Sequence, residues 1–149
     1  ILATQHQRLK TTDAQREFDF IARARTSDTA AQHRLFLSLI PKSGRLVEPW
    51  AESALSLLCD PTRETQANNY LKPGLDAIVD IQQTSDIFFP GYWLSALMDD
   101  HHSAEARQTV NSWIADHERQ KAWQQGLRAA LMNKIKENAY WMLLRPAKK

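Results

Sequence analysis

The stretch that decides the fold runs from residue 86 to residue 94 and reads Asp-Ile-Phe-Phe-Pro-Gly-Tyr-Trp-Leu. Pro90 fixes its own φ, lacks a backbone N–H and biases Phe89 toward an extended conformation. Gly91 permits a backbone path that a side chain would block. We therefore predict that one helix ends before this stretch and another begins after it. The residues of this structural corner are Asp86, Ile87, Phe88, Phe89, Pro90 and Trp93.

The large side chains of the corner are expected to lock the two helices together, because buried aromatic side chains dominate the energetics of protein cores. On this interpretation, truncating either Phe88 or Phe89 to alanine costs about 3–5 kcal/mol. The alternative is an exposed loop on which a ligand stacks, in which case both truncations cost little.

The composition is that of a helical globular domain. Of the 149 residues, 43% are hydrophobic, 24% are charged and only 4 are glycine. A chain of this length buries about 70% of its unfolded surface, so one domain over residues 1–149 is the simplest prediction. Cys59 is the only cysteine, which excludes an intrachain disulfide and a cysteine-rich metal site. No apolar run approaches the roughly 18 residues of a membrane span, so we expect a soluble cytoplasmic or periplasmic protein.

Apolar residues recur at helical spacing along most of the chain, and no run alternates as a strand would. Residues 26–28 and Ser103 are suited to cap helices, and Pro73 is suited to begin one. The predicted helices span approximately 14–24, 29–39, 48–58, 68–71, 74–83, 92–98, 103–117 and 121–143. Six to eight helices with short links predict an all-α fold, either an antiparallel array or a curved stack of helix pairs like degenerate HEAT or armadillo repeats. The last helix is expected to bury Trp123, Leu127, Leu131, Ile135 and Met142.

Two segments resemble metal sites, and we reject both. A zinc-peptidase helix needs His-Glu-x-x-His, whereas residues 117–121 read His-Glu-Arg-Gln-Lys and place a cation where a ligand is required. The run Asp99-Asp100-His101-His102 is rich in potential ligands. However, adjacent residues of a helix do not face one another, so we interpret this run as a solvated helix end. The sequence therefore predicts no catalytic residue, no metal ligand and no cofactor on this chain.

Charge is distributed unevenly along the chain. Residues 119–149 contain eight lysines or arginines and one acid, whereas residues 1–118 contain eleven and sixteen. A basic segment of this kind can bind nucleic acid, but its aromatic and aliphatic residues fall in the expected apolar stripe rather than between the basic ones. We predict a solvated face, or a face that pairs with an acidic surface of a neighbouring domain, rather than nucleic-acid binding.

Several segments, taken in order, resemble the C-terminal helical region of the aminopeptidase N family of zinc metallopeptidases. Residues 85–90, Ser-Asp-Ile-Phe-Phe-Pro, are very similar to the family's Gly-Asp-Ile-Phe-Phe-Pro, apart from Ser85. The other matching segments are 16–18, 21–24, 34–36, 47–50, 54–55, 59–63, 70–73, 80–84, 103–106 with Val110, and 127–145. In this order, the segments are distributed over the span from Asp13 to Arg145, which is nearly the whole chain.

The resemblance implies a non-catalytic region of a larger enzyme. In that family, this region packs as a helical array over the catalytic domain and helps to enclose the substrate chamber. Zinc and the catalytic groups are expected in a catalytic domain of the same polypeptide, because the zinc motif and the exopeptidase loop are missing here. The chain opens without Met, which we interpret as a piece of a longer polypeptide. The expected partners are that catalytic domain and peptide substrates; the alternative is an independent helical-repeat module that binds another protein.

Overall fold

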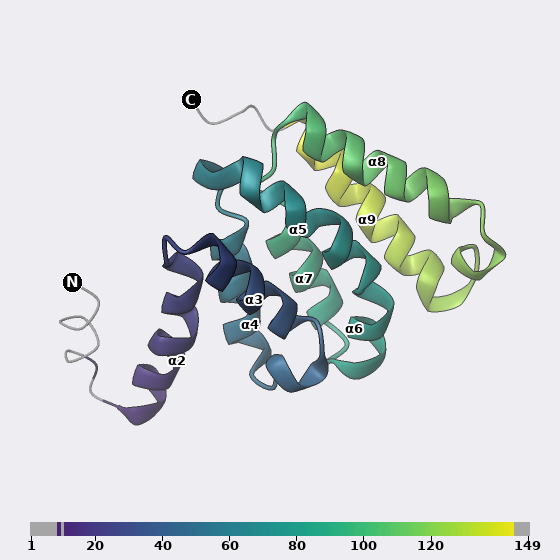
Figure 1. Ribbon diagram of the computed structural model, residues 1–149. Helices are drawn as coiled ribbons and strands as arrows, with labels where there is room; N and C mark the ends of the chain where they lie inside the picture. The colour runs from purple at the N-terminus through teal and green to yellow at the C-terminus, as the bar shows by residue number, and fades with distance from the viewer. Residues whose placement is uncertain (1–8, 10, 145–149) are drawn as a thin grey trace. The chain divides into compact units, whose positions relative to one another are not determined.

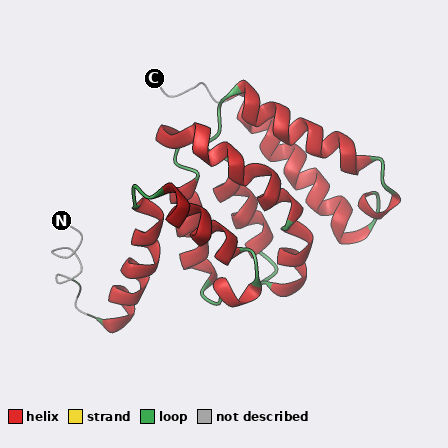
Figure 2. Ribbon diagram, viewed as in Figure 1, coloured by secondary structure: helices red, strands yellow, loops and turns green. Residues whose placement is uncertain are grey.

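The computed structural model describes Leu9 and residues 11–144. Within these residues, every regular element is a helix: eight α-helices and four short 3₁₀ helices (Figures 1 and 2). The all-α prediction is therefore confirmed. The chain divides into two compact units, Ile1–Leu58 and Cys59–Lys149. No helix in the described ranges has the length and apolar character needed to cross a membrane.

The first unit contains three α-helices. They are α2 (Thr12–Ala22), α3 (Thr29–Leu39) and α4 (Glu48–Leu58), with 3₁₀ turns at Arg23–Arg25 and Lys42–Gly44. As predicted for residues 26–28, a cap begins α3: the Asp28 carboxylate accepts the N–H of Ala31 at 3.0 Å. Helix α4 packs against both α2 and α3. The core of this unit consists of Ala24, Leu35, Phe36, Leu39, Ala51, Ala54, Leu55 and Leu58, whereas α2 has no fully buried residue.

The second unit contains five α-helices. They are α5 (Glu64–Asp76), α6 (Ile78–Thr84), α7 (Phe89–Met98), α8 (Ala104–Glu118) and α9 (Gly126–Leu144), with 3₁₀ turns at Pro61–Arg63 and Lys121–Trp123. Helix α7 packs against α5, α6 and α9, and α8 packs against α5 and α9. The Ser103 hydroxyl caps α8 by accepting the N–H of Ala106 at 3.1 Å, as predicted.

Close contact between α5 and α7 organises the core of the second unit. The buried Trp93 indole donates from Nε1 to the carbonyl oxygen of Gly74 at 3.1 Å. A Cβ on Gly74 would lie 2.6 Å from a methyl carbon of the fully buried Leu97. The absence of a side chain at position 74 therefore lets the two helices approach. The largest buried side chains around this contact are Tyr70, Leu71, Leu75, Ile78, Ile81, Phe89, Trp93 and Leu94.

Prolines mark helix boundaries differently from the prediction. Pro73 lies inside α5 rather than at the start of a helix, so residues 68–71 belong to a longer helix instead of a short turn. Pro90 lies in the first turn of α7, which begins at Phe89. A proline is tolerated in the first turn of a helix because its missing N–H has no intrahelical partner there. Phe89 is consequently helical, and the prediction that it is extended was wrong.

The last helix also differs from the prediction. Residues 121–143 do not form one helix: a 3₁₀ turn at Lys121–Trp123 is followed by α9, which begins at Gly126. Gly126 has a φ of 59°, a left-handed conformation that glycine adopts without steric cost. Leu127, in the first turn of α9, is 71% exposed rather than buried, while Trp123, Leu131, Ile135 and Met142 are buried.

Candidate functional site

The structural corner is half core and half surface. Phe89, Pro90 and Trp93 are buried, and the rings of Phe89 and Trp93 meet with centroids 6.2 Å apart. In contrast, Ile87 is 83% exposed and Phe88 is 68% exposed. We predicted that the large side chains of the corner, Ile87, Phe88, Phe89 and Trp93, lock the two helices together. This prediction was wrong for Ile87 and Phe88. The exposed carboxylate of Asp86 accepts the N–H of Phe88 at 2.9 Å, so the turn holds Ile87 and Phe88 outward.

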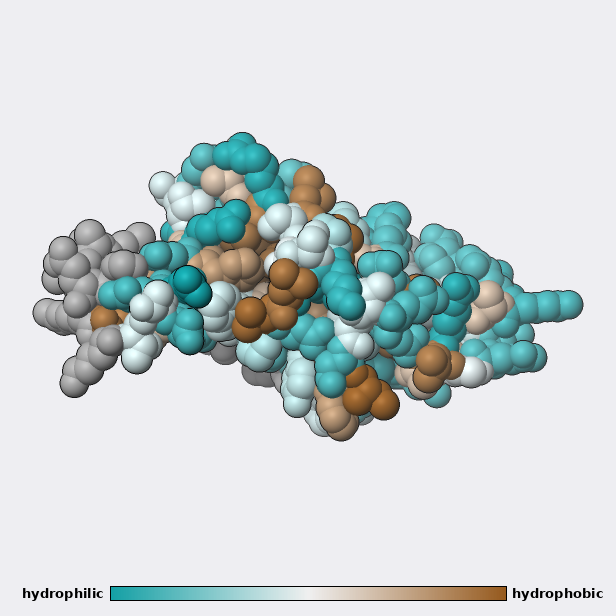
Figure 3. Space-filling view, turned by 90° about the horizontal axis from the view of Figure 1, so that it is seen from below, coloured by the Kyte–Doolittle hydropathy of each residue, from teal (hydrophilic) through white to brown (hydrophobic). Residues whose placement is uncertain are grey.

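Tyr92 extends the exposed half of the corner. It lies one helical turn after Phe88 and is 54% exposed, and side chains four residues apart share one face of a helix. We call Ile87, Phe88 and Tyr92 the apolar corner patch. Apolar residues also interrupt the hydrophilic surface at several separate places in the view of Figure 3. The corner patch belongs to the stretch of residues 86–94, in which Phe89 and Trp93 are buried.

A polar cluster forms where the chain enters α8. From α5, the Glu64 carboxylate accepts the N–H groups of His102 and Ser103, at 2.7 and 2.5 Å. Also from α5, Asn68 donates from Nδ2 to the Ser103 hydroxyl at 3.2 Å, and its Oδ1 lies 2.9 Å from His101 Nδ1. Because an amide oxygen only accepts hydrogen bonds, His101 is protonated on Nδ1. The cluster ties the first half of α5 to the start of α8.

His101 is fully buried, so the interpretation of residues 99–102 as a solvated helix end was wrong for this side chain. Its Nε2 is buried without a hydrogen-bond partner in the part of the chain that the structure describes. Burial lowers the pKa of His101 to about 4, although the negative charges of Glu64 and Asp100 act in the opposite direction. His101 is therefore neutral at neutral pH. The sequence offered no signal for this burial, because it depends on Asn68 in another helix.

Glu64 is held as an anion by the start of α8. Desolvation alone would raise its pKa, but the N–H groups of His102 and Ser103 and the Ser103 hydroxyl outweigh that effect, so the pKa lies below its ordinary value. A carboxylate at a helix N-terminus satisfies otherwise unpaired N–H groups and interacts favourably with the helix dipole. Glu64 thus acts as a capping group supplied from a different helix.

We expect Glu64→Ala to lower the free energy of unfolding by about 1–2 kcal/mol, the usual cost of losing a capping group. Glu64→Gln keeps an acceptor oxygen but loses the charge, so about half of that loss is expected from the dipole contribution. Urea unfolding of the two variants and the wild type provides the measurement. Equal stability of Glu64→Ala and the wild type would contradict the assigned cap.

A second cluster is aromatic and lies along α8. The Trp113 and His117 rings stack with centroids 3.9 Å apart, and Trp123 meets Trp113 edge-on at 5.2 Å. The Trp113 indole donates to Asp76 Oδ1 at 2.8 Å, and Lys72 pairs with the same carboxylate at 2.6 Å. A cavity of about 350 Å³ adjoins the stack; it is lined by Lys72, Glu105, Gln108, Thr109, Ser112, Trp113, Asp116 and His117. Its mixture of cations and anions indicates no single ligand class.

The residues that resembled a zinc motif have other roles in the structure. His117 Nδ1 donates to the Trp113 carbonyl oxygen at 2.7 Å, and Glu118 pairs with Lys136 of α9 at 2.7 Å. Lys134 pairs with Glu137 at 3.2 Å, so two of the basic residues near the C-terminus find acids within this unit. Across Leu9 and residues 11–144, no three His, Cys, Asp or Glu side chains are grouped to hold a metal ion.

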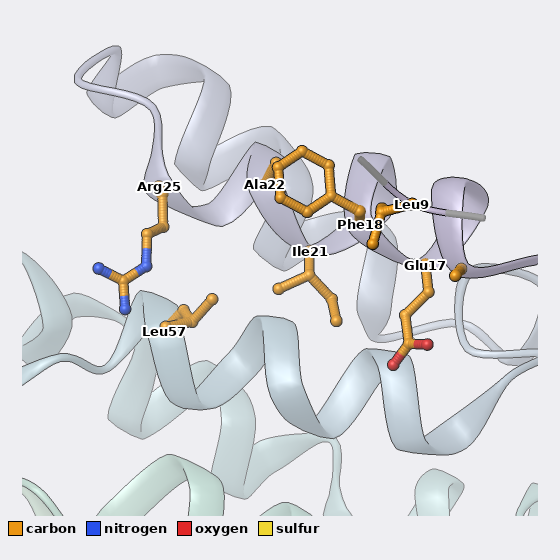
Figure 4. A pocket seen from close by; sticks show the side chains of 8 residues that line it. Leu9, Glu17, Phe18, Ile21, Ala22, Arg25 and Leu57 are labelled. Carbon is orange, nitrogen blue, oxygen red and sulfur yellow. The ribbon is translucent and has the colours of Figure 1, made fainter. Parts of the chain in front are cut away.

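An apolar cavity lies in the first unit beside α2. It has a volume of about 350 Å³ and is lined by Leu9, Ala14, Glu17, Phe18, Ile21, Ala22, Arg25 and Leu57 (Figure 4). Leu57 belongs to α4, so the cavity follows the contact between α2 and α4. The two charged residues, Glu17 and Arg25, are exposed, which leaves the cavity accessible from solvent.

Comparisons with protein-family models, with curated proteins and with solved structures find no match to this chain. The candidate sites are therefore interpreted from their residues and geometry, together with the sequence resemblance described above.

Proposed function

We propose that this chain is the non-catalytic C-terminal helical region of an enzyme similar to the zinc aminopeptidases. In that enzyme it helps to close the substrate chamber and limits access to peptide N-termini. The catalytic domain, with its zinc, would belong to the same polypeptide and would be the main partner of this chain. The proposal is supported by the ordered resemblance over residues 13–145 and by the all-helical fold.

The observation that carries the proposal is the division of the corner into a buried and an exposed half. Phe89 and Trp93 anchor the segment in the core, whereas Ile87 and Phe88 remain 83% and 68% exposed. Burying one large apolar side chain contributes roughly 1.5–3 kcal/mol. An anchored turn that presents two such side chains is therefore well suited to contact another domain.

The coding region upstream of Ile1 tests the proposal directly. A zinc-binding His-Glu-x-x-His motif upstream, followed by a glutamate ligand, is expected. A start codon immediately before Ile1 would contradict it. Metal analysis of the purified chain is an independent test: stoichiometric zinc on this chain alone would also contradict the proposal, because it assigns the metal to the catalytic domain.

The second candidate function is an independent helical module that binds another protein. The apolar corner patch favours it as well, because exposed apolar side chains grouped in one place are typical of protein interfaces. The upstream coding region distinguishes the two candidates, since an independent module would begin close to Ile1.

A further inference from the structure

Within the part of the chain that the structure describes, the face of α2 that lines the apolar cavity is only partly covered. Phe18, Ile21 and Ala22 are only half-buried, and no residue of α2 is fully buried. A cavity of about 350 Å³ can accept large side chains, since small-molecule pockets begin at roughly 300 Å³. The groove between α2 and α4 is thus large enough to receive apolar side chains from a further helix.

The charges along this groove are arranged about its centre. Glu17 and Ile21 lie one turn apart on the same side of α2, and Arg25 follows in the 3₁₀ turn Arg23–Arg25, after α2 ends at Ala22. Figure 4 shows the three side chains pointing in the same direction, with Ile21 between the carboxylate and the guanidinium. Neither the Glu17 carboxylate nor the Arg25 guanidinium has a hydrogen-bond or ion-pair partner within the described residues. The apolar centre is therefore flanked by one unpaired anion and one unpaired cation.

We propose that the groove binds the α2 helix of a second copy of this chain, in the antiparallel direction. A two-fold axis near Ile21 would place Glu17 of each copy opposite Arg25 of the other. Glu17 lies about 6 Å along α2 from Ile21, at 1.5 Å per residue, and Arg25 lies on the other side of Ile21, in the 3₁₀ turn that follows α2. A parallel arrangement would instead bring like charges together. The charge pattern is therefore self-complementary in one orientation only, as a two-fold interface requires.

The association is expected to be weak and sensitive to salt. One helix face and its groove form an interface below the standard size, which is typical of transient complexes. Exposed ion pairs contribute little each and are screened by salt. The inference goes beyond the proposed function and does not depend on it: a zinc motif upstream of Ile1 would leave it unchanged.

Charge reversal provides the decisive experiment. Dimer formation by the full chain is measured by sedimentation at low salt. Protein concentrations run from about 10 µM to about 1 mM, because weak dimers are populated only in this range. The Glu17→Arg variant presents two cations beside the groove, and Arg25→Glu presents two anions. Each variant alone is expected to dissociate at least about tenfold more readily, through like-charge repulsion. An equimolar mixture of the two variants is expected to form a heterodimer, because both cross-pairs are then attractive.

Matched variants separate the groove from the rest of the surface. Ile21→Ser is expected to weaken the dimer, whereas Leu46→Ser, which changes a 76% exposed leucine of the same unit, is expected to leave it unchanged. Circular dichroism checks that every variant folds. A wild-type chain that stays monomeric at the highest concentration would overturn the inference, even if the groove bound an apolar dye or another helix. A dimer that tolerates both charge reversals would also overturn it.

Discussion

Replacing Phe89 by alanine is expected to lower the free energy of unfolding by about 3–5 kcal/mol, whereas the same replacement at Phe88 is expected to cost less than about 1 kcal/mol. Phe89 is 2% exposed and its ring lies against that of Trp93. Its removal leaves a cavity where α7 meets the core. Phe88 is 68% exposed, so its truncation removes few protein contacts.

The two substitutions form a matched pair, because they remove the same atoms from adjacent positions. The hydrogen bond that Asp86 accepts from Phe88 involves only the backbone N–H and survives in both variants. Urea unfolding followed by tryptophan fluorescence provides the measurement. Four of the five tryptophans belong to the second unit, so the signal reports mainly on the unit that contains the corner. Similar losses for the two variants would contradict the assignment of one ring to the core and the other to the surface.

The same pair also bears on the proposed function. If Phe88 contacts a catalytic domain, Phe88→Ala should leave the isolated chain stable but destabilise the longer polypeptide. Burial of one such ring contributes roughly 1.5–3 kcal/mol. A Phe88→Ala variant that is as stable as the wild type in both contexts would remove the main structural support for a domain interface at this corner.

Local features of the fold could be predicted from the sequence. The helical class, the cap of α3 by Asp28 and the cap of α8 by Ser103 each depend on residue type and short spacing. Pro73 could not be placed in this way, because a proline inside a helix is favoured only by surrounding packing. The neighbouring Gly74 accepts a hydrogen bond from Trp93, a contact across nineteen residues that short-range patterns do not contain.

The candidate sites were harder to predict than the helices, because their residues meet only in three dimensions. The run Asp-Ile-Phe-Phe-Pro indicated a corner, but its hydrophobicity could not distinguish the buried Phe89 from the exposed Phe88. His101 sits in a polar run, yet it is buried because Asn68 supplies a partner for Nδ1. Glu64 gave no sequence signal as the cap of a helix that begins forty residues later.

Acidification is expected to destabilise the second unit through His101. The pKa of the folded His101 is about 4, compared with an ordinary value of 6.5. As the pH falls below 6.5, the unfolded chain takes up a proton that the folded chain excludes. The contribution of the neutral His101 to the free energy of unfolding is therefore complete above pH 6.5 and is lost as the pH falls toward 4. A pKa difference of this size corresponds to about 3 kcal/mol over the whole window.

The His101→Gln variant isolates this effect. Its amide can still donate to Asn68 Oδ1 but does not titrate. Between pH 6.5 and pH 5, the free energy of unfolding of the variant should therefore fall by about 2 kcal/mol less than that of the wild type. Measurements stay above the ordinary pKa of 4.5 for Glu64, whose lowered pKa adds a loss of the same sign at lower pH. His33→Gln, the same substitution at an exposed position of α3, is measured in parallel. If His101→Gln kept the wild-type pH dependence of the free energy of unfolding, the proton uptake would belong to another group. The buried neutral imidazole could then not be the source of the acid sensitivity.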